Sequence, residues 1–224
     1  RALVTEIIAR EVGGRVRVVS GVCAEGSDDA IDQALAAKRA GADAVLLMPP
    51  HHWMRFGRTS ATAINFFRDV AQDADIDIIV HQYPAWTKAS YSLHEMLCLV
   101  EIPHVVSIKT GTRDMARWGY DYRTLKAAAP GVSIVSCHDE YLLATLLDGC
   151  DGALVGFAGV RNMALSLVLL DHMQDKSHAR QLQQQFLRSL LAGMLADEWS
   201  PGLRDGEEAF LATMFQSLGR MLVG

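Results

Sequence analysis

The chain has 224 residues, half of them hydrophobic and 21% charged, and its formal net charge is −5 at pH 7. This length suits one packed domain, and the lack of a basic tract argues against a nucleic-acid partner. Neither a membrane-spanning apolar run nor a signal peptide is recognisable in the sequence, so no membrane partner is expected.

The first part of the chain predicts a helix, a strand and a second helix. A helical pattern covers residues 2–14 and a strand is predicted at 16–22. The next helix is predicted over 27–41, with Ser27 as its N-cap and Gly41 as its C-terminal stop.

Five more apolar runs follow, and each predicts a strand: 42–50, 76–84, 105–110, 132–139 and 152–159. The segment 51–58 is predicted to be a loop. Helices are expected between the strands, near 59–73, 92–101, 113–128 and 140–149, and from Asn162 almost to the end of the chain.

The six strands are nearly continuous apolar runs, and each is followed by a helix. This pattern is typical of a parallel sheet covered by helices, either an open doubly wound sheet or a closed (β/α)8 barrel. No G-x-G-x-x-G follows a strand and no G-x-x-x-x-G-K-[ST] occurs, which favours the barrel.

A (β/α)8 TIM barrel has eight strands, so the first two strands are expected to be missing from this chain. We therefore predict that residues 1–160 supply barrel strands three to eight. Residues 161–224 are predicted to form a C-terminal helical segment packed on the barrel.

The four cysteines form no C-x-x-C pair and lie mostly among apolar residues: Cys23, Cys98, Cys137 and Cys150. This usage indicates reduced core thiols in a cytoplasmic protein.

Lys109 is the lysine that ends an apolar strand, whereas the other four lysines fall in helical or loop contexts. Strand alternation predicts that Val105, Ser107 and Lys109 share one face. Removal from water favours the neutral form of an amine, which can form a Schiff base with a ketone. On the pattern alone, a lysine that reaches water or pairs with Asp114 or Asp139 is the simpler interpretation.

His81 and Tyr83 are two residues apart at the end of the strand at 76–84, so their side chains are predicted to share a face. Either could shuttle protons near the Lys109 amine. The alternative is a core tyrosine beside a hydrogen-bonded histidine.

Histidines also follow other strand ends, at His51, His52 and His138-Asp139. Such residues could hold a metal in a metal-dependent barrel hydrolase. There is no H-x-H pair on one strand and no second clear carboxylate, so this alternative is the weaker one, and no metal ligand is assigned.

Several motifs resemble the dihydrodipicolinate synthase / N-acetylneuraminate lyase family: "AGADAVLLMPP", the proline of "HQYP", "IPHVVSIKTGTRD" and "GALVGFAGV". The resemblance spans residues 2–222. It implies a (β/α)8 barrel that acts as a class I aldolase or lyase on pyruvate or another 2-keto acid, without a cofactor and as a homo-oligomer.

The resemblance also implies roles for single residues. Lys109 falls on the Schiff-base lysine, and His81 falls on the catalytic tyrosine, with Tyr83 on a second tyrosine that touches substrate. A further tyrosine pair of the family falls on His51 and His52. These histidines would take over the proton relay and substrate contacts.

The family resemblance also implies which residues contact the two substrates. Trp86 takes the place of an arginine that binds a substrate carboxylate, which implies a less charged aldehyde partner. Val155 and Gly156 fall beside the carboxylate of the keto acid, and Ser107 replaces a glycine. A non-catalytic keto-acid-binding barrel, which has lost the tyrosine relay, is the main alternative function.

Overall fold

The computed structural model describes residues 1–84, 87–137, 141–156 and Ala192. The chain divides into two compact units, Arg1–Met163 and Ala164–Gly224, and the following description concerns the first. The predicted helical segment 161–224 lies outside the described residues except for Ala192.

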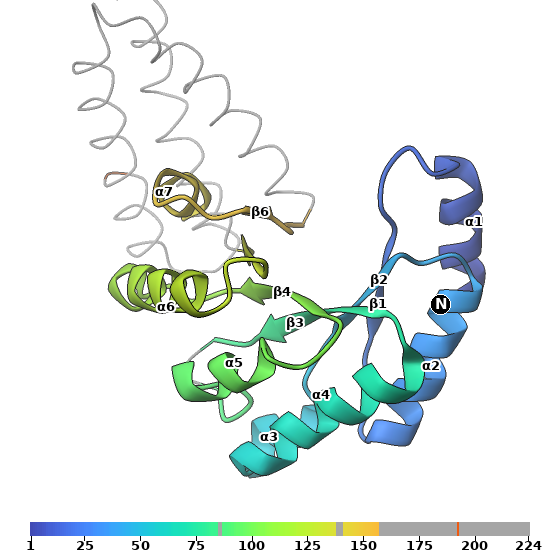
Figure 1. Ribbon diagram of the computed structural model, residues 1–224, viewed down its shortest axis with the longest axis horizontal. Helices are drawn as coiled ribbons and strands as arrows, with labels where there is room; N and C mark the ends of the chain where they lie inside the picture. Colours follow the sequence, from blue (N-terminus) through green and yellow to red (C-terminus); the bar gives the residue numbers. More distant parts are fainter. Residues whose placement is uncertain (85–86, 138–140, 157–191, 193–224) are drawn as a thin grey trace, which may run out of the picture. The chain divides into compact units, whose positions relative to one another are not determined.

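Six parallel strands form one sheet, in which each strand pairs with the next one along the chain (Figure 1). Their bounds are β1 Val19–Val22, β2 Ala44–Leu47, β3 Asp77–Gln82, β4 Val105–Thr110, β5 Ser133–Ser136 and β6 Gly152–Ala153. The predicted parallel sheet is thereby confirmed, and its sequential order is that of a barrel rather than of a doubly wound sheet. The six described strands form a half-barrel, not a closed one.

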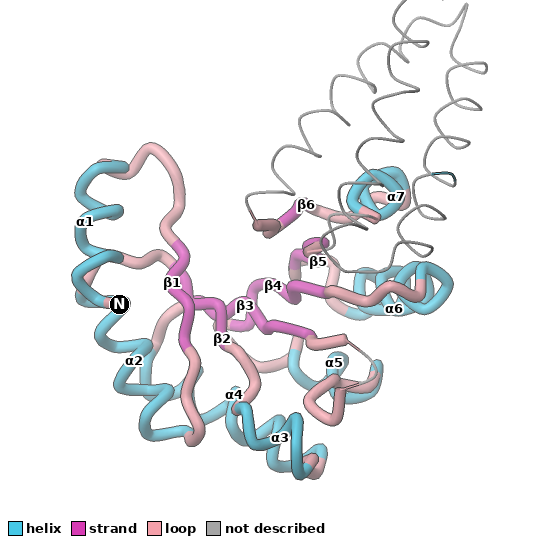
Figure 2. The backbone as a smooth tube through the Cα atoms, turned by 180° about the vertical axis from the view of Figure 1, so that it is seen from behind, coloured by secondary structure: helices cyan, strands magenta, loops and turns pink. Residues whose placement is uncertain are grey.

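Seven helices are described in the first unit: α1 Ala2–Val12, α2 Ser27–Arg39, α3 His51–Phe56, α4 Ser60–Ala74, α5 Leu93–Leu99, α6 Met115–Ala128 and α7 Leu142–Leu147. Figure 2 shows the strands as a curved row, with α2, α4, α5 and α6 along its convex side. Among the described helices, none combines the length and the hydrophobicity that a membrane crossing requires.

The core lies between the convex face of the sheet and the helices. Val45 and Leu47 of β2 and Ile78 and Val80 of β3 are fully buried there, together with Phe67 of α4. Each buried side chain of this size contributes about 1.5–3 kcal/mol of transfer free energy. The residues between them, such as Ile79 and His81 on β3, therefore face the concave side.

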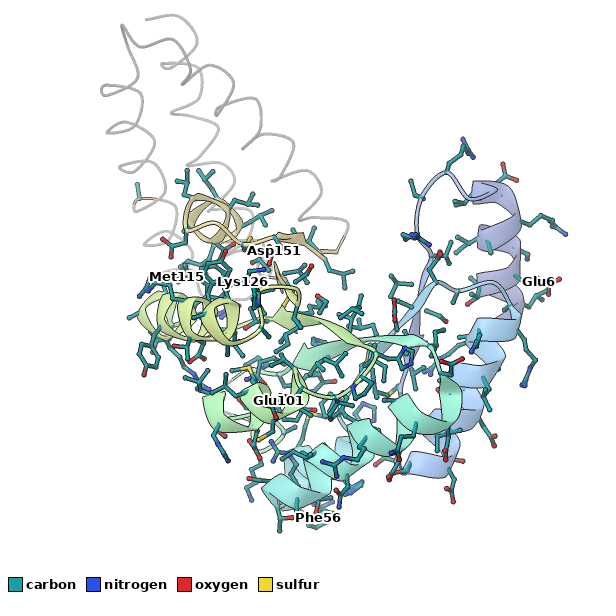
Figure 3. The ribbon with its side chains drawn as sticks, in the orientation of Figure 1. Glu6, Phe56, Glu101, Met115, Lys126 and Asp151 are labelled. Carbon is teal, nitrogen blue, oxygen red and sulfur yellow. The ribbon has the colours of Figure 1, made fainter. Side chains whose placement is uncertain are left out.

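Two aspartates accept backbone hydrogen bonds from the neighbouring strand segment at the amino ends of the strands. Asp43, just before β2, accepts a hydrogen bond from the backbone N–H of Val18 (2.8 Å). Asp151, just before β6, does the same for the N–H of Ile134 (2.7 Å), and Lys126 Nζ lies 3.1 Å from its other oxygen. Lys126 and Asp151 lie close together in Figure 3.

The prediction of Ser27 as an N-cap is wrong, because the helix begins one residue earlier than expected. Gly26 is the N-cap of α2, and the Ser27 hydroxyl donates to Asp69 Oδ2 (2.8 Å) instead. The predicted stop is confirmed: the helix ends at Arg39, and Gly41 follows with φ of 89°, a conformation that favours glycine.

The predicted loop at 51–58 is also wrong in part, since α3 occupies most of it. The Glu25 carboxylate accepts hydrogen bonds from the backbone N–H groups of His51 and His52 (3.2 Å each), which satisfies the start of this short helix. Trp53 is buried against Phe66, with 5.5 Å between ring centroids, and anchors it.

Alternation along β4 is interrupted, which corrects the predicted face. Ile78 pairs with Val105 but Ile79 pairs with Ser107, so Val106 has no register partner and forms a β-bulge. Val105 therefore joins the core cluster with Ile78, while Ser107 and Lys109 align with the concave-face residues of β3.

No disulfide joins the four cysteines, in agreement with the predicted reduced state. All four are half-buried rather than in the core, because each lies at or beyond the end of a helix or strand or on a partly exposed helix face.

Candidate active site

Chemically active side chains gather where β1 to β4 end. Cys23 and Glu25 follow β1, His51 and His52 follow β2, and Tyr83 follows β3. His81 is the last residue but one of β3, and Lys109 is the last residue but one of β4. Carboxyl ends of parallel strands meet at one edge of the sheet, which is where barrel enzymes hold their active sites.

His81 and Lys109 are register partners on neighbouring strands, which lie about 4.8 Å apart. Burial, and then the charge of Lys109, lowers the pKa of His81 from 6.5 to about 4. The imidazole is therefore neutral at pH 7 and can accept a proton. Its Nδ1 is buried and has no hydrogen-bond partner among the described residues.

Lys109 is half-buried, and no hydrogen bond or ion pair holds its amine within the described ranges. The predicted pairing with Asp114 is therefore wrong: the Asp114 carboxylate instead caps α6 by accepting from the N–H of Arg117 (3.0 Å). Asp139 lies outside the described residues. In the sheet register Lys109 aligns with His81, on the concave side.

Tyr83 touches His81 edge to face, with ring centroids 4.8 Å apart and planes at 74°. The predicted shared face is thereby confirmed. Burial, and then the nearby Cys23 thiol, raises the pKa of the Tyr83 hydroxyl above its usual value of 10. The phenol stays protonated at neutral pH and can donate a proton where His81 can accept one.

Gln82 fixes the loop that leaves β3, a role that the sequence analysis missed. Its side-chain amide exchanges two hydrogen bonds with the backbone of Tyr91, each 2.7 Å long. The loop that carries Tyr83 is thus closed by a buried amide pair. Trp86 lies outside the described residues.

His51 and His52 share a carboxylate that the sequence analysis also missed. Glu25 Oε1 lies 3.2 Å from His51 Nδ1, and Oε2 lies 2.7 Å from His52 Nδ1. The hydrogen bond from the His52 side chain is the main cause that lowers the pKa of Glu25 to about 2, so the carboxylate is charged at neutral pH. Both imidazoles are about half exposed, and their hydrogen-bonding partners are Glu25 and Cys23 rather than Lys109.

Val155 and Gly156 follow β6 at the same edge of the sheet. The N–H of Leu154 donates to Ser136 O (2.9 Å), which extends the pairing of β5 with β6 by one residue. Val155 is half-buried and Gly156 is exposed, with no heavy atom of the described residues within 4 Å of where a Cβ would lie.

The candidate metal ligands do not assemble in the part of the chain that the structure describes. No group of three His, Cys, Asp or Glu side chains there could hold a metal ion. His138 and Asp139 lie outside the described residues.

A sequence model of the dihydrodipicolinate synthetase family matches residues 1–200. The 4-hydroxy-tetrahydrodipicolinate synthase of Nitrosospira multiformis is 32% identical over 187 residues, which are 83% of this chain and 60% of that protein. A probable 2-dehydro-3-deoxy-D-pentonate aldolase of Escherichia coli is 26% identical over 148 residues, 66% of this chain and 48% of that protein. The chain thus spans about half to three fifths of these relatives.

Solved structures share the fold. One is the prophage protein YagE of E. coli, of the dihydrodipicolinic acid synthase family, in complex with pyruvate: the TM-score is 0.71 at 23% identity, covering 94% of this chain and 69% of that one. Another is the N-acetylneuraminate lyase of Mycoplasma synoviae, with a TM-score of 0.66 at 17% identity, covering 97% and 79%. At these identities the likeness concerns the fold alone.

Proposed function

Because the chain belongs to the dihydrodipicolinate synthetase family, we propose that it is a lyase or aldolase that forms a Schiff base between Lys109 and pyruvate or another 2-keto acid. The observation that carries this proposal is the pairing of Lys109 with a neutral His81 at the carboxyl edge of the sheet. The pyruvate bound to the structural relative YagE supports a keto acid as substrate.

The proposed reaction begins when the Lys109 amine attacks the ketone carbon. A C–N bond forms and the carbonyl oxygen takes up the proton that the nitrogen gives up; a second proton on that oxygen lets water leave the carbinolamine, and an iminium ion remains. Loss of a proton from the neighbouring carbon gives an enamine, which adds to an aldehyde carbonyl; bond cleavage runs through the same steps in reverse.

His81 and Tyr83 would carry the protons of these steps. The neutral imidazole accepts a proton from the amine or from the carbon next to the iminium, while the protonated phenol of Tyr83 donates to the leaving oxygen. We place His52 in support of this relay and His51 among the substrate contacts.

The remaining substrate contacts are proposed from the family resemblance. Val155 and Gly156 would line the carboxylate end of the keto acid, and Trp86 would face an aldehyde that carries little charge. We also propose that residues 1–160 supply strands three to eight of a (β/α)8 barrel, that 161–224 packs on it, and that the protein is a homo-oligomer.

Borohydride trapping tests the proposal. The protein is incubated with pyruvate, reduced, and weighed by mass spectrometry, with the modified residue located by peptide mapping. We expect one reduced pyruvate on Lys109. Lys109→Ala should abolish the adduct, whereas Lys88→Ala, which changes an exposed lysine whose amine donates to Arg55 O (3.2 Å), should not.

The main alternative, a binding protein for keto acids, gives a different result. Pyruvate would then bind saturably, as measured by calorimetry, without any adduct on reduction. A metal-dependent hydrolase would instead retain stoichiometric zinc in an elemental assay of the purified protein. Either result would overturn the Schiff-base proposal, provided that the protein is folded and that Lys109→Ala gives the same result.

A further inference from the structure

A cysteine, a histidine and a glutamate meet at the carboxyl edge of the sheet, and the proposed reaction of Lys109 uses only the histidine, His51, as a substrate contact. Cys23 Sγ lies 3.7 Å from Nδ1 and 3.9 Å from Nε2 of His51. Glu25 Oε1 lies 3.2 Å from His51 Nδ1. The order is that of a nucleophile, a base and a group that orients the base.

Two of the three members, Cys23 and Glu25, are held by further contacts. Gln33 holds the backbone of Cys23 on both sides: its Oε1 accepts from the Cys23 N–H (3.3 Å) and its Nε2 donates to the Cys23 carbonyl (3.1 Å). Glu25 is held by the backbone N–H groups of His51 and His52. The thiol and the carboxylate therefore approach the His51 ring from supported positions.

The electrostatics suit proton transfer from the thiol. Glu25 is ionised at neutral pH, since hydrogen bonds from His52 and His51 lower its pKa to about 2. A carboxylate beside Nδ1 favours the tautomer with the proton on Nδ1, so the acceptor for the thiol proton is Nε2, the more distant of the two ring nitrogens at 3.9 Å from Sγ. The same carboxylate stabilises the imidazolium that forms.

From this geometry we propose that Cys23, His51 and Glu25 form a nucleophilic thiol centre and that Cys23 is a modification site for soft carbon electrophiles. With an alkyl iodide, a C–S bond forms and the C–I bond breaks. Iodide leaves with the bonding electrons, and His51 takes the thiol proton. This chemistry does not depend on the Schiff base at Lys109.

The centre adjoins the candidate active site through Tyr83, because the Cys23 side chain is near enough to contribute, after burial, to raising the pKa of the Tyr83 hydroxyl. The thiol is half-buried, as are Cys98, Cys137 and Cys150, so the other three serve as internal references of similar exposure. Cys150 is the slowest expected reference because its thiol donates to Gly152 O (3.3 Å).

The test is the rate of alkylation by iodoacetamide at pH 7, followed for each cysteine by mass spectrometry of the whole chain. We expect Cys23 to react about tenfold faster than the other three. His51→Gln should slow Cys23 about tenfold and Glu25→Gln about threefold, and neither should change the other cysteines. Added imidazole should restore the rate in His51→Ala.

Two variants serve as controls. His104→Gln removes another histidine that lies between two carboxylates, Asp75 and Asp77, and should leave Cys23 unaffected. Lys109→Ala should also leave it unaffected, which separates this centre from the proposed aldolase chemistry. Unchanged rates at the three reference cysteines report that a variant is folded. The proposal would be overturned if Cys23 were alkylated no faster than Cys98, or if the loss of His51 did not slow the alkylation of Cys23.

Discussion

His81 on β3 and Lys109 on β4 are register partners, and the imidazole lies in a buried site beside the lysine charge. Burial, with the charge of Lys109, holds the pKa of His81 at about 4 in the folded chain, against 6.5 for an unperturbed histidine. At a pH between 6.5 and about 4, this histidine binds a proton in the unfolded chain but not in the folded chain. The stability from the neutral imidazole is therefore complete above pH 6.5 and falls as the pH drops toward 4.

We expect this loss to be about 2–3 kcal/mol, allowing for the partial exposure of the ring. Urea unfolding at pH 7, 5.5 and 4.5 measures it. His81→Asn should flatten this part of the curve, whereas His94→Asn, at an exposed position, should not. Equal pH slopes for His81→Asn and the unmodified chain would contradict the prediction.

The side chain of Gln82 pairs with the backbone of Tyr91, and its loss should loosen the loop that carries Tyr83. In Gln82→Leu the buried N–H of Tyr91 loses its acceptor, while its carbonyl keeps a weaker donor, Arg117 Nη2 at 3.3 Å. We expect a cost of about 2 kcal/mol. Gln82→Glu keeps the acceptor but buries a carboxylate whose second oxygen meets the Tyr91 carbonyl, so it should cost more than Gln82→Leu, as measured by urea midpoints; a smaller cost would count against the pairing.

The strands could be predicted from sequence because short, nearly continuous apolar runs are typical of buried parallel strands. All six are where the runs lie, and the strand at 105–110 has the predicted bounds. The bulge at Val106 could not be predicted, since Val105 and Val106 are both β-branched and nothing in their chemistry indicates which one leaves the register. The predicted shared face therefore failed at Val105 but held for Ser107 and Lys109.

The candidate site was predicted in part for a related reason. Lys109, His81 and Tyr83 end predicted strands, so their neighbourhood followed from the parallel sheet. Cys23 and Glu25 follow the first strand in the same way, and inspection of that strand end would have found them. Helix α3 could not be predicted because its first N–H group is hydrogen-bonded by Glu25, a residue 26 positions earlier in the chain.

Arg58 and Glu95 form a buried ion pair, with side chains 5% and 6% exposed. Glu95 also accepts from the N–H of Ser92 (2.7 Å) and so caps α5. Removing one partner leaves a buried charge, so Glu95→Leu should cost about 3–5 kcal/mol, and Arg58→Met a similar amount. The double variant should cost clearly less than the sum of the two.

The exposed pair of Arg17 and Asp43 provides the comparison, because the Arg17 side chain is 86% exposed. Arg17→Met should cost much less than either single variant of the buried pair, because water screens an exposed ion pair. Urea unfolding of the five proteins measures both effects. Additive costs for Arg58→Met and Glu95→Leu would show that the two side chains stabilise the fold independently.

Ser107 lies on the concave face two residues before Lys109, and its hydroxyl is buried without a partner in the described part of the chain. An unpaired buried hydroxyl costs about 1–3 kcal/mol, so Ser107→Ala should leave stability unchanged or raise it by about 1 kcal/mol. Ser20 is the matched control: it is equally buried in β1, but its hydroxyl is 3.0 Å from that of Thr5, so Ser20→Ala should cost about 1 kcal/mol. Thermal and urea unfolding compare the two, and a larger cost at Ser107 than at Ser20 would mean that its hydroxyl is paired after all.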